Sequence, residues 1–107
     1  MREWTLREMC ESCGGTRRAV QGYEKYGLIA PTGKTDRGYL LYNEATMQET
    51  VKIKQLQNYG FSLQEIVDFR QKAPQEQKSL LREKRERLLR RKAEIERCLR
   101  EIEKMIE

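Results

Sequence analysis

Residues 16–31 of this chain read TRRAVQGYEKYGLIAP and hold the signals from which its architecture can be predicted. Thr16 can cap a helix, because its side-chain oxygen can accept a hydrogen bond from a backbone N–H of the first turn. We expect this helix to run to about Lys25 and to be ended by Gly27. Residues 28–31 are predicted to be extended, since the residue before a proline prefers that conformation.

A second short helix is predicted directly before this one. Residues 5–8 read TLRE, a capping-box pattern in which the hydroxyl and the carboxylate each satisfy an unpaired backbone N–H. This helix should run to about Cys13, where Gly14 and Gly15 stop it. Two short helices separated by a Gly-Gly turn are typical of a helix-turn-helix.

A small hairpin and two more helices are predicted to follow. The turn-forming residues 35–38 precede the β-prone residues 39–42, and this pattern indicates a hairpin, or wing. Asn43 can cap a third helix that runs to about Asn58 and offers Met47, Val51, Ile53 and Leu56 for burial. Residues 62–65 form another capping box, which starts a fourth helix with Leu63, Ile66 and Val67 on its apolar face.

The C-terminal third of the chain has the pattern of a coiled coil. Residues 75–107 contain no Gly, Pro or aromatic residue, and apolar residues recur there at seven-residue steps. A helix of about 31 residues is ~46 Å long, and its narrow apolar stripe cannot make it stable alone. We therefore expect a homodimer. The predicted dimerisation residues are Leu81, Leu88, Ile95, Cys98, Leu99, Ile102, Met105 and Ile106.

Together these elements predict a mainly α fold with two domains. Residues 1–73 form the winged helix-turn-helix domain, with four short helices and a small β-hairpin wing. Residues 74–107 form the dimerisation helix, and Pro74 marks the junction between the two.

The composition argues against an enzyme. Histidine, the commonest general base and metal ligand, is absent, and the sequence contains no Gly-rich phosphate loop. We expect no cofactor and no bound metal. No apolar run approaches the ~20 residues of a membrane span, and no secretory signal opens the sequence, so we expect a soluble cytoplasmic protein with no membrane partner.

The cysteines form one recognisable pattern. Cys10 and Cys13 make a C-x-x-C, a spacing that suits a metal or redox site, and Cys98 lies far away. A four-ligand zinc site would need further Cys or His residues that the chain lacks. We interpret both residues of the pair as small core residues of a short helix. Unpaired cysteines indicate a reducing compartment.

The distribution of basic and aromatic residues suggests DNA as a partner. The chain has 22 Lys and Arg against 17 Asp and Glu, a net charge of +5. In a helix-turn-helix the start of the second helix reaches base edges in the major groove, and a basic wing can hold flanking phosphates. Packing is the alternative role for each tyrosine. The candidate DNA contacts are Thr16, Arg17, Arg18, Gln21, Tyr23, Lys34, Arg37, Gly38, Tyr39 and Tyr42.

Between Leu6 and about Phe69 the chain resembles the MerR family of bacterial transcription regulators. The motifs that carry the resemblance are Tyr23-Glu24, Gly27-Leu28-Ile29, Pro31, Gly38-Tyr39, Tyr42, Ile53, Leu56, Tyr59-Gly60-Phe61-Ser62-Leu63 and Glu65-Ile66. The resemblance implies a homodimer, paired through an antiparallel coiled coil and bound to an inverted-repeat promoter site in double-stranded DNA. It also implies distortion of the promoter for RNA polymerase. By position it assigns Thr16, Arg17 and Arg18 to the recognition helix, Tyr23 and Tyr39 to contacts with the DNA backbone, and Arg37 to the wing.

The chain departs from the family's usual motifs at two places, and two other functions stay open. Gln21-Gly22 stands where Arg-Tyr is usual, and Leu40 stands where Arg is usual. These departures imply either a lower affinity for DNA or contacts redistributed among the remaining basic residues. The first alternative is a DNA-bending architectural or excisionase-like protein, against which the long helix argues. The second is a coiled-coil adaptor whose degenerate head binds protein.

Overall fold

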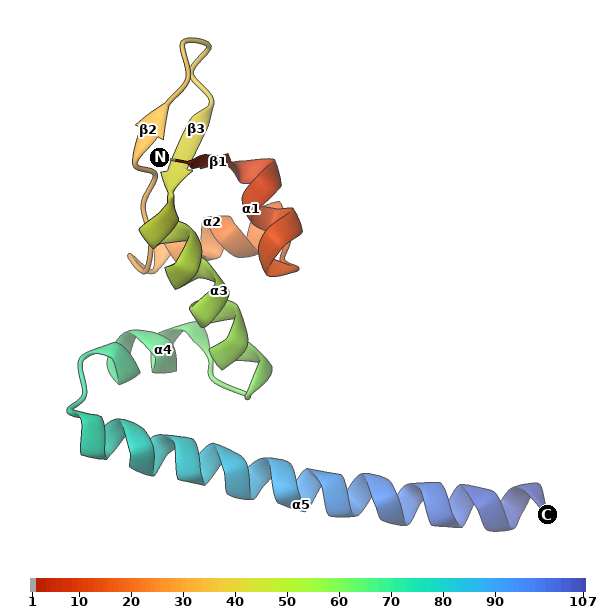
Figure 1. Ribbon diagram of the computed structural model, residues 1–107. Helices are drawn as coiled ribbons and strands as arrows, with labels where there is room; N and C mark the ends of the chain where they lie inside the picture. Colours follow the sequence, from red (N-terminus) through yellow and green to blue (C-terminus); the bar gives the residue numbers. More distant parts are fainter. Residues whose placement is uncertain (1) are drawn as a thin grey trace. The chain divides into compact units, whose positions relative to one another are not determined.

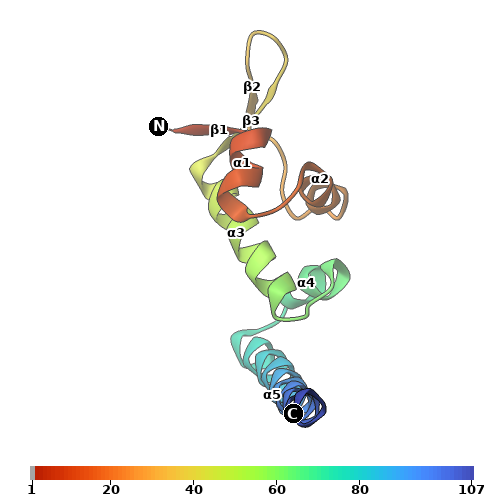
Figure 2. The same cartoon turned by 90° about the vertical axis from the view of Figure 1, so that its right-hand side faces the viewer.

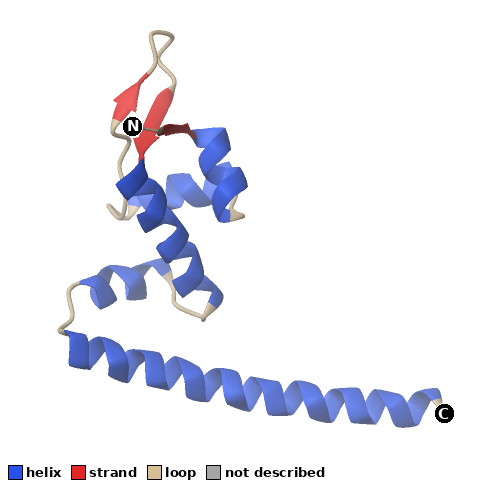
Figure 3. Cartoon of the chain, in the orientation of Figure 1, coloured by secondary structure: helices blue, strands red, loops and turns tan. Residues whose placement is uncertain are grey.

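The computed structural model describes residues 2–107, which form five helices and three short strands. The chain divides into two compact units, Met1–Arg70 and Gln71–Glu107. Helices dominate both units, and the strands gather in one place (Figure 3). The mainly α winged helix-turn-helix architecture is confirmed, while the domain boundary after residue 73 stays a prediction.

The helix-turn-helix consists of α1 (Leu6–Cys13) and α2 (Arg17–Lys25). The predicted capping box is present, since Thr5 Oγ1 accepts from Glu8 N at 3.2 Å and Glu8 Oε1 accepts from Thr5 N at 3.0 Å. Gly14 ends α1 with a left-handed φ of 70°, a conformation that glycine adopts at little cost. Thr16 Oγ1 then caps α2 by accepting from Ala19 N at 3.1 Å. Local signals therefore set both ends of the turn.

The sheet contains one strand more than the sequence predicts. Strand β1 (Glu3–Thr5) pairs antiparallel with β3 (Leu40–Asn43), which pairs on its other edge with β2 (Gly33–Lys34). Strands β2 and β3 form the wing, and the loop between them extends away from the helices of this unit (Figure 1 and Figure 2). The three residues of β1 are too few to show the alternating pattern by which a sequence predicts a strand.

Helices α3 (Glu44–Asn58) and α4 (Leu63–Arg70) complete the N-terminal unit. Asn43 caps α3, as its side-chain oxygen accepts from Thr46 N at 2.9 Å. The capping box of α4 is also present, because Ser62 Oγ accepts from Glu65 N at 3.1 Å and Glu65 Oε1 from Ser62 N at 3.0 Å. The Arg70 side chain at the end of α4 donates to Leu28 O at 2.9 Å, which joins α4 to the segment after α2.

The core of this unit draws residues from every helix and from β3. Of the four α3 residues offered for burial, Met47 and Ile53 are buried, whereas Val51 and Leu56 are half-buried. Phe61 packs edge-on against Phe69, with ring centroids 5.3 Å apart. The buried apolar residues are Met9, Val20, Tyr23, Leu28, Ile29, Tyr42, Met47, Ile53, Phe61 and Ile66.

The C-terminal unit is built on one continuous helix, α5 (Pro74–Ile106), with Pro74 in its first turn. Proline is tolerated there because its missing N–H would lack a helical partner anyway. All eight predicted dimerisation residues are exposed in the single chain. None of the helices that the structure describes is both long enough and apolar enough to cross a membrane.

Candidate nucleic-acid interface

The cap and the N-terminal half of α2 present four of the predicted contact residues to solvent. Thr16, Arg17, Arg18 and Gln21 are all exposed. The unpaired backbone N–H groups of a helix start favour negative charge, and Arg17 and Arg18 add two cationic side chains to the same turn. This end of α2 can therefore attract a phosphate group, and an arginine fork can also grip the edge of a guanine.

The wing presents the second group of predicted residues. Lys34, Arg37, Gly38 and Tyr39 are exposed, and the Tyr39 side chain is 65% accessible. The loop is closed by backbone bonds from Thr35 N to Tyr39 O at 2.8 Å and from Gly38 N to Thr35 O at 2.9 Å. Gly38 has a φ of 86°, a conformation that favours glycine. The turn therefore has a defined shape that holds two cationic side chains and one phenol outward.

The cationic side chains of these two groups are available to an external partner. In the N-terminal unit, which ends at Arg70 and is called the head below, the ion pairs join Arg2 to Glu8 at 3.3 Å, Arg7 to Glu11 at 3.3 Å and Arg70 to Glu49 at 3.5 Å. Within residues 2–107, Arg17, Arg18, Lys34 and Arg37 take part in none of the ion pairs. No carboxylate in the described part of the chain forms an ion pair with any of these four side chains.

Two of the predicted contact residues lie inside the protein. Tyr23 and Tyr42 are fully buried. The Tyr23 hydroxyl donates to Gln57 Oε1 at 2.6 Å, and the Tyr42 hydroxyl donates to Glu24 Oε1. A phenol enclosed in this way cannot reach a phosphate, so the expected DNA contacts of both tyrosines are corrected to packing and internal hydrogen bonding. Packing is the alternative that the sequence left open for these side chains.

The bonding partners of these tyrosines are residues that the sequence did not single out. Gln57 lies near the end of α3, 34 positions from Tyr23, and Glu24 lies 18 positions from Tyr42. No local pattern links residues at such separations. The burial of Tyr42 and its bond to Glu24 both raise the pKa of its hydroxyl, which therefore remains a donor.

Gly22 has a structural role that bears on the family's missing aromatic residue. A Cβ atom at Gly22 would lie 3.6 Å from Leu63 Cδ1, so this position of α2 faces α4. Gly22 is half-buried, whereas its neighbour Gln21 is exposed. The departure at Gly22 therefore affects the packing of α2 against α4. Of the two departures in α2, only the one at Gln21 is exposed to an external partner.

The cysteine pair lies at the edge of the core, not inside it as the sequence predicts. Cys10 and Cys13 are half-buried, and the Cys13 thiol donates weakly to Cys10 O at 3.9 Å. Burial is the main cause that raises the pKa of the Cys10 thiol, which keeps it protonated. No group of three or more His, Cys, Asp or Glu side chains that could hold a metal ion occurs within the described residues.

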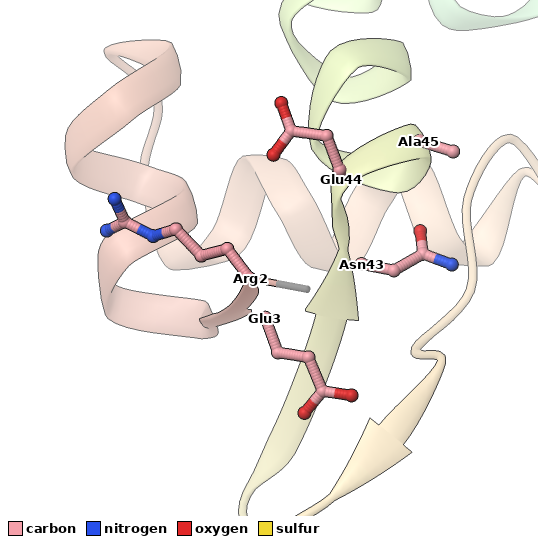
Figure 4. Close-up of a pocket in the computed structure, with 5 residues that line it drawn as sticks. All are labelled: Arg2, Glu3, Asn43, Glu44 and Ala45. Carbon is pink, nitrogen blue, oxygen red and sulfur yellow. The ribbon is translucent and has the colours of Figure 1, made fainter.

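A shallow pocket of about 490 Å³ lies elsewhere in the head, where β1 meets the junction of β3 and α3. Its lining residues are Arg2, Glu3, Asn43, Glu44 and Ala45, and the Arg2 and Glu3 side chains point away from one another (Figure 4). Both signs of charge are present in this lining, which gives no preference for an anion. None of the predicted contact residues lines the pocket.

Known bacterial proteins are similar to this chain in sequence. The nodulation protein NolA of Bradyrhizobium elkanii is 38% identical over 65 residues, which cover 61% of this chain and 30% of NolA. The mercuric resistance operon regulatory protein of Bacillus cereus is 33% identical over 64 residues, 60% of this chain and 48% of that protein. This chain therefore spans less than half the length of either relative.

Solved structures share the fold over nearly the whole chain. A MerR family transcriptional regulator from Bacillus cereus has a TM-score of 0.77 at 26% identity and covers 97% of this chain and 80% of its own. HiNmlR, a MerR family regulator lacking the sensor domain, was solved bound to promoter DNA. It has a TM-score of 0.75 at 23% identity, and the match covers 92% of this chain and 79% of the HiNmlR chain. The sequence model that describes the MerR HTH family of regulatory proteins matches residues 4–73 of this chain. The chain thus belongs to the MerR helix-turn-helix family of regulatory proteins.

Proposed function

We propose that this chain is a transcription regulator that binds promoter DNA as a homodimer. The observation that carries the proposal is the exposed first turn of α2, where Arg17 and Arg18 stand at the helix start and take part in none of the ion pairs of residues 2–107. In a helix-turn-helix this turn enters the major groove. The wing residues Lys34 and Arg37 would hold flanking phosphates, which set the register on the duplex.

Membership of the MerR family supports DNA as the partner. HiNmlR, which shares this fold, was solved on promoter DNA. The interface we propose for this chain contains Thr16, Arg17, Arg18, Gln21, Lys34, Arg37, Gly38 and Tyr39. It omits the buried Tyr23 and Tyr42.

The exposed apolar stripe of α5 supports the homodimer. Ile95, Leu99 and Ile102 are each more than half accessible in the single chain, although side chains of this size are usually buried. The seven-residue repeat fits a second copy of the same helix. We take the antiparallel sense from the family resemblance. Two heads related by a two-fold axis would then read the two halves of an inverted repeat.

The proposal includes an action on the shape of the promoter. A dimer that grips two half-sites with its helices and wings can bend or untwist the DNA between them, at a free-energy cost that depends on the intervening sequence. Distortion of this kind would let RNA polymerase engage both promoter elements.

Selection from a random duplex library with the purified chain, followed by salt titration of the selected duplex, tests the proposal. Arg17, Arg18, Lys34 and Arg37 give up to eight phosphate contacts in a dimer, which predicts a slope of log K against log salt of up to about −7. Enrichment of an inverted repeat would support the proposed function. Weak binding that enriches no sequence would overturn it and favour the protein-adaptor alternative.

A further inference from the structure

Two buried phenols fix the C-terminal half of α2 to two different elements of the head. Tyr23, on α2, donates its hydroxyl hydrogen bond to Gln57 on α3 at 2.6 Å. Glu24, the next residue of α2, accepts a hydrogen bond from Tyr42 on β3. Since β3 forms one side of the wing, α2 is joined to both the wing and α3 through consecutive residues.

Breaking either of these hydrogen bonds has a large free-energy cost. Both tyrosines are fully buried, so a hydroxyl that lost its partner could not turn to solvent. The bond between Tyr42 and Glu24 also has a carboxylate as its acceptor, which makes it stronger than a neutral one. The bonds therefore resist rotation of α2 against the sheet and against α3.

We propose that Tyr23 and Tyr42 are positioning residues for DNA recognition, which hold α2 at the angle at which its first turn and the wing contact one duplex. The inference rests on the proposed function and assigns a role to the two tyrosines that cannot touch DNA themselves. Gln57 and Glu24 are the acceptors through which they act.

The geometry of a helix explains why such a fixed point matters at the other end of α2. Arg17 lies six residues before Tyr23, a rise of about 9 Å along the helix axis. A tilt of about 10° around the fixed point would move the Arg17 backbone by roughly 1.5 Å, beyond the ~0.5 Å within which a binding group must be held. Loss of the bonds would therefore weaken the contacts made by Arg17 and Arg18.

The first test uses the free protein and needs no DNA. Residual dipolar couplings of backbone amides report the direction of each helix in the wild-type chain and in the Tyr23→Phe/Tyr42→Phe variant. We expect the couplings of α2 to depart from the wild-type orientation, while those of α1 and α3 still fit it. Tyr59→Phe, which removes a hydroxyl from an exposed residue at the end of α3, is the matched control and should change nothing. Unchanged α2 couplings in the double variant would overturn the inference.

The second test measures affinity for the selected duplex in double-mutant cycles. Tyr42→Phe should weaken binding about fivefold, the usual worth of one hydrogen bond. If the hydroxyl acts by aiming α2, its effect should fall below twofold when Arg17 is already alanine. The effect should stay about fivefold when the wing residue Arg37 is alanine. Equal effects in both backgrounds would overturn the inference, because a general loss of stability and a direct contact are both additive.

A second pair of variants serves where Tyr42→Phe does not fold, as judged by circular dichroism. Glu24→Gln keeps a side-chain oxygen as acceptor and should retain more affinity than Glu24→Leu, which has none. Equal affinities of these two variants would also overturn the inference. Failure of the proposed function is a separate result, since it would appear as no selected duplex with the wild-type chain.

Discussion

Gly22 is a residue of α2 at which the native glycine should be less stabilising than an alanine. Its backbone is helical, and a Cβ atom there would make an ordinary contact of 3.6 Å with Leu63 Cδ1. We expect Gly22→Ala to raise the free energy of unfolding by about 0.5–1 kcal/mol, because alanine loses less conformational entropy in a helix. Urea denaturation checks this value.

Gly27 provides the matched control for that substitution. It ends the turn after α2 with a φ of 73°, where an alanine would be strained whatever the space around it. Gly27→Ala should therefore lower the unfolding free energy. A destabilised Gly22→Ala variant would mean that α2 and α4 cannot admit even one methyl group.

Glu8 gives the N-terminal capping box a dependence on pH. The hydrogen bond from Thr5 N is the main cause that lowers the pKa of Glu8 below its usual 4.5. A lowered pKa in the folded state stabilises the protein above pH 4.5, and this contribution is lost as the pH falls through the lowered value. Urea titrations from pH 7 to pH 3 should show the unfolding free energies of wild type and Glu8→Gln converging in acid. A constant difference would contradict the role of the ionised carboxylate.

The residues that sequence reasoning placed correctly are those whose partners are close in the chain. The caps at Thr5, Thr16, Asn43 and Ser62 each bond a backbone N–H three positions away, so a four-residue pattern contains the whole interaction. Tyr23 bonds a residue 34 positions away, and its burial depends on how three elements pack. A tyrosine next to a basic helix start carries no local sign of which way its ring turns.

Among the elements, helices were easier to predict than strands for a related reason. Each of α1–α4 has its own start signal, whereas β1 exists only because β3 offers it an edge. The register of that pairing sets Trp4 opposite Tyr42 and Glu3 opposite Asn43. Strand β1 therefore depends on long-range pairing that three residues of sequence cannot reveal.

The junction between β3 and α3 allows a prediction at the level of one element. Asn43 caps α3 through its side-chain oxygen. Asn43→Ala should lower the unfolding free energy by about 1 kcal/mol. Asn43→Asp keeps a side-chain acceptor and should therefore keep most of the stabilisation that the cap provides. Affinity for DNA, measured where both variants are folded, should be unchanged. Equal losses in the two variants would show that the cap contributes little.

For the whole molecule, the apolar stripe of α5 is the surface that a single chain leaves exposed to water. We expect Ile95→Glu to give monomers in sedimentation equilibrium, because a carboxylate in a coiled-coil seam loses its water without gaining a partner. Ala93→Glu adds the same charge two residues away, off the seam, and should leave the mass unchanged. A dimeric Ile95→Glu variant would contradict the prediction that Ile95 is a dimerisation residue of α5.

The affinity of the Arg17→Ala/Arg18→Ala variant for the selected duplex tests the central claim most directly. Arg97→Ala/Arg100→Ala removes the same two charges from exposed positions of α5 off the seam, and so controls for net charge. If the first turn of α2 reads DNA, the Arg17/Arg18 variant loses sequence-selective binding at constant salt, while the control stays within a few-fold of wild type. Equal losses in the two variants would mean that charge alone drives binding and would contradict the proposed interface.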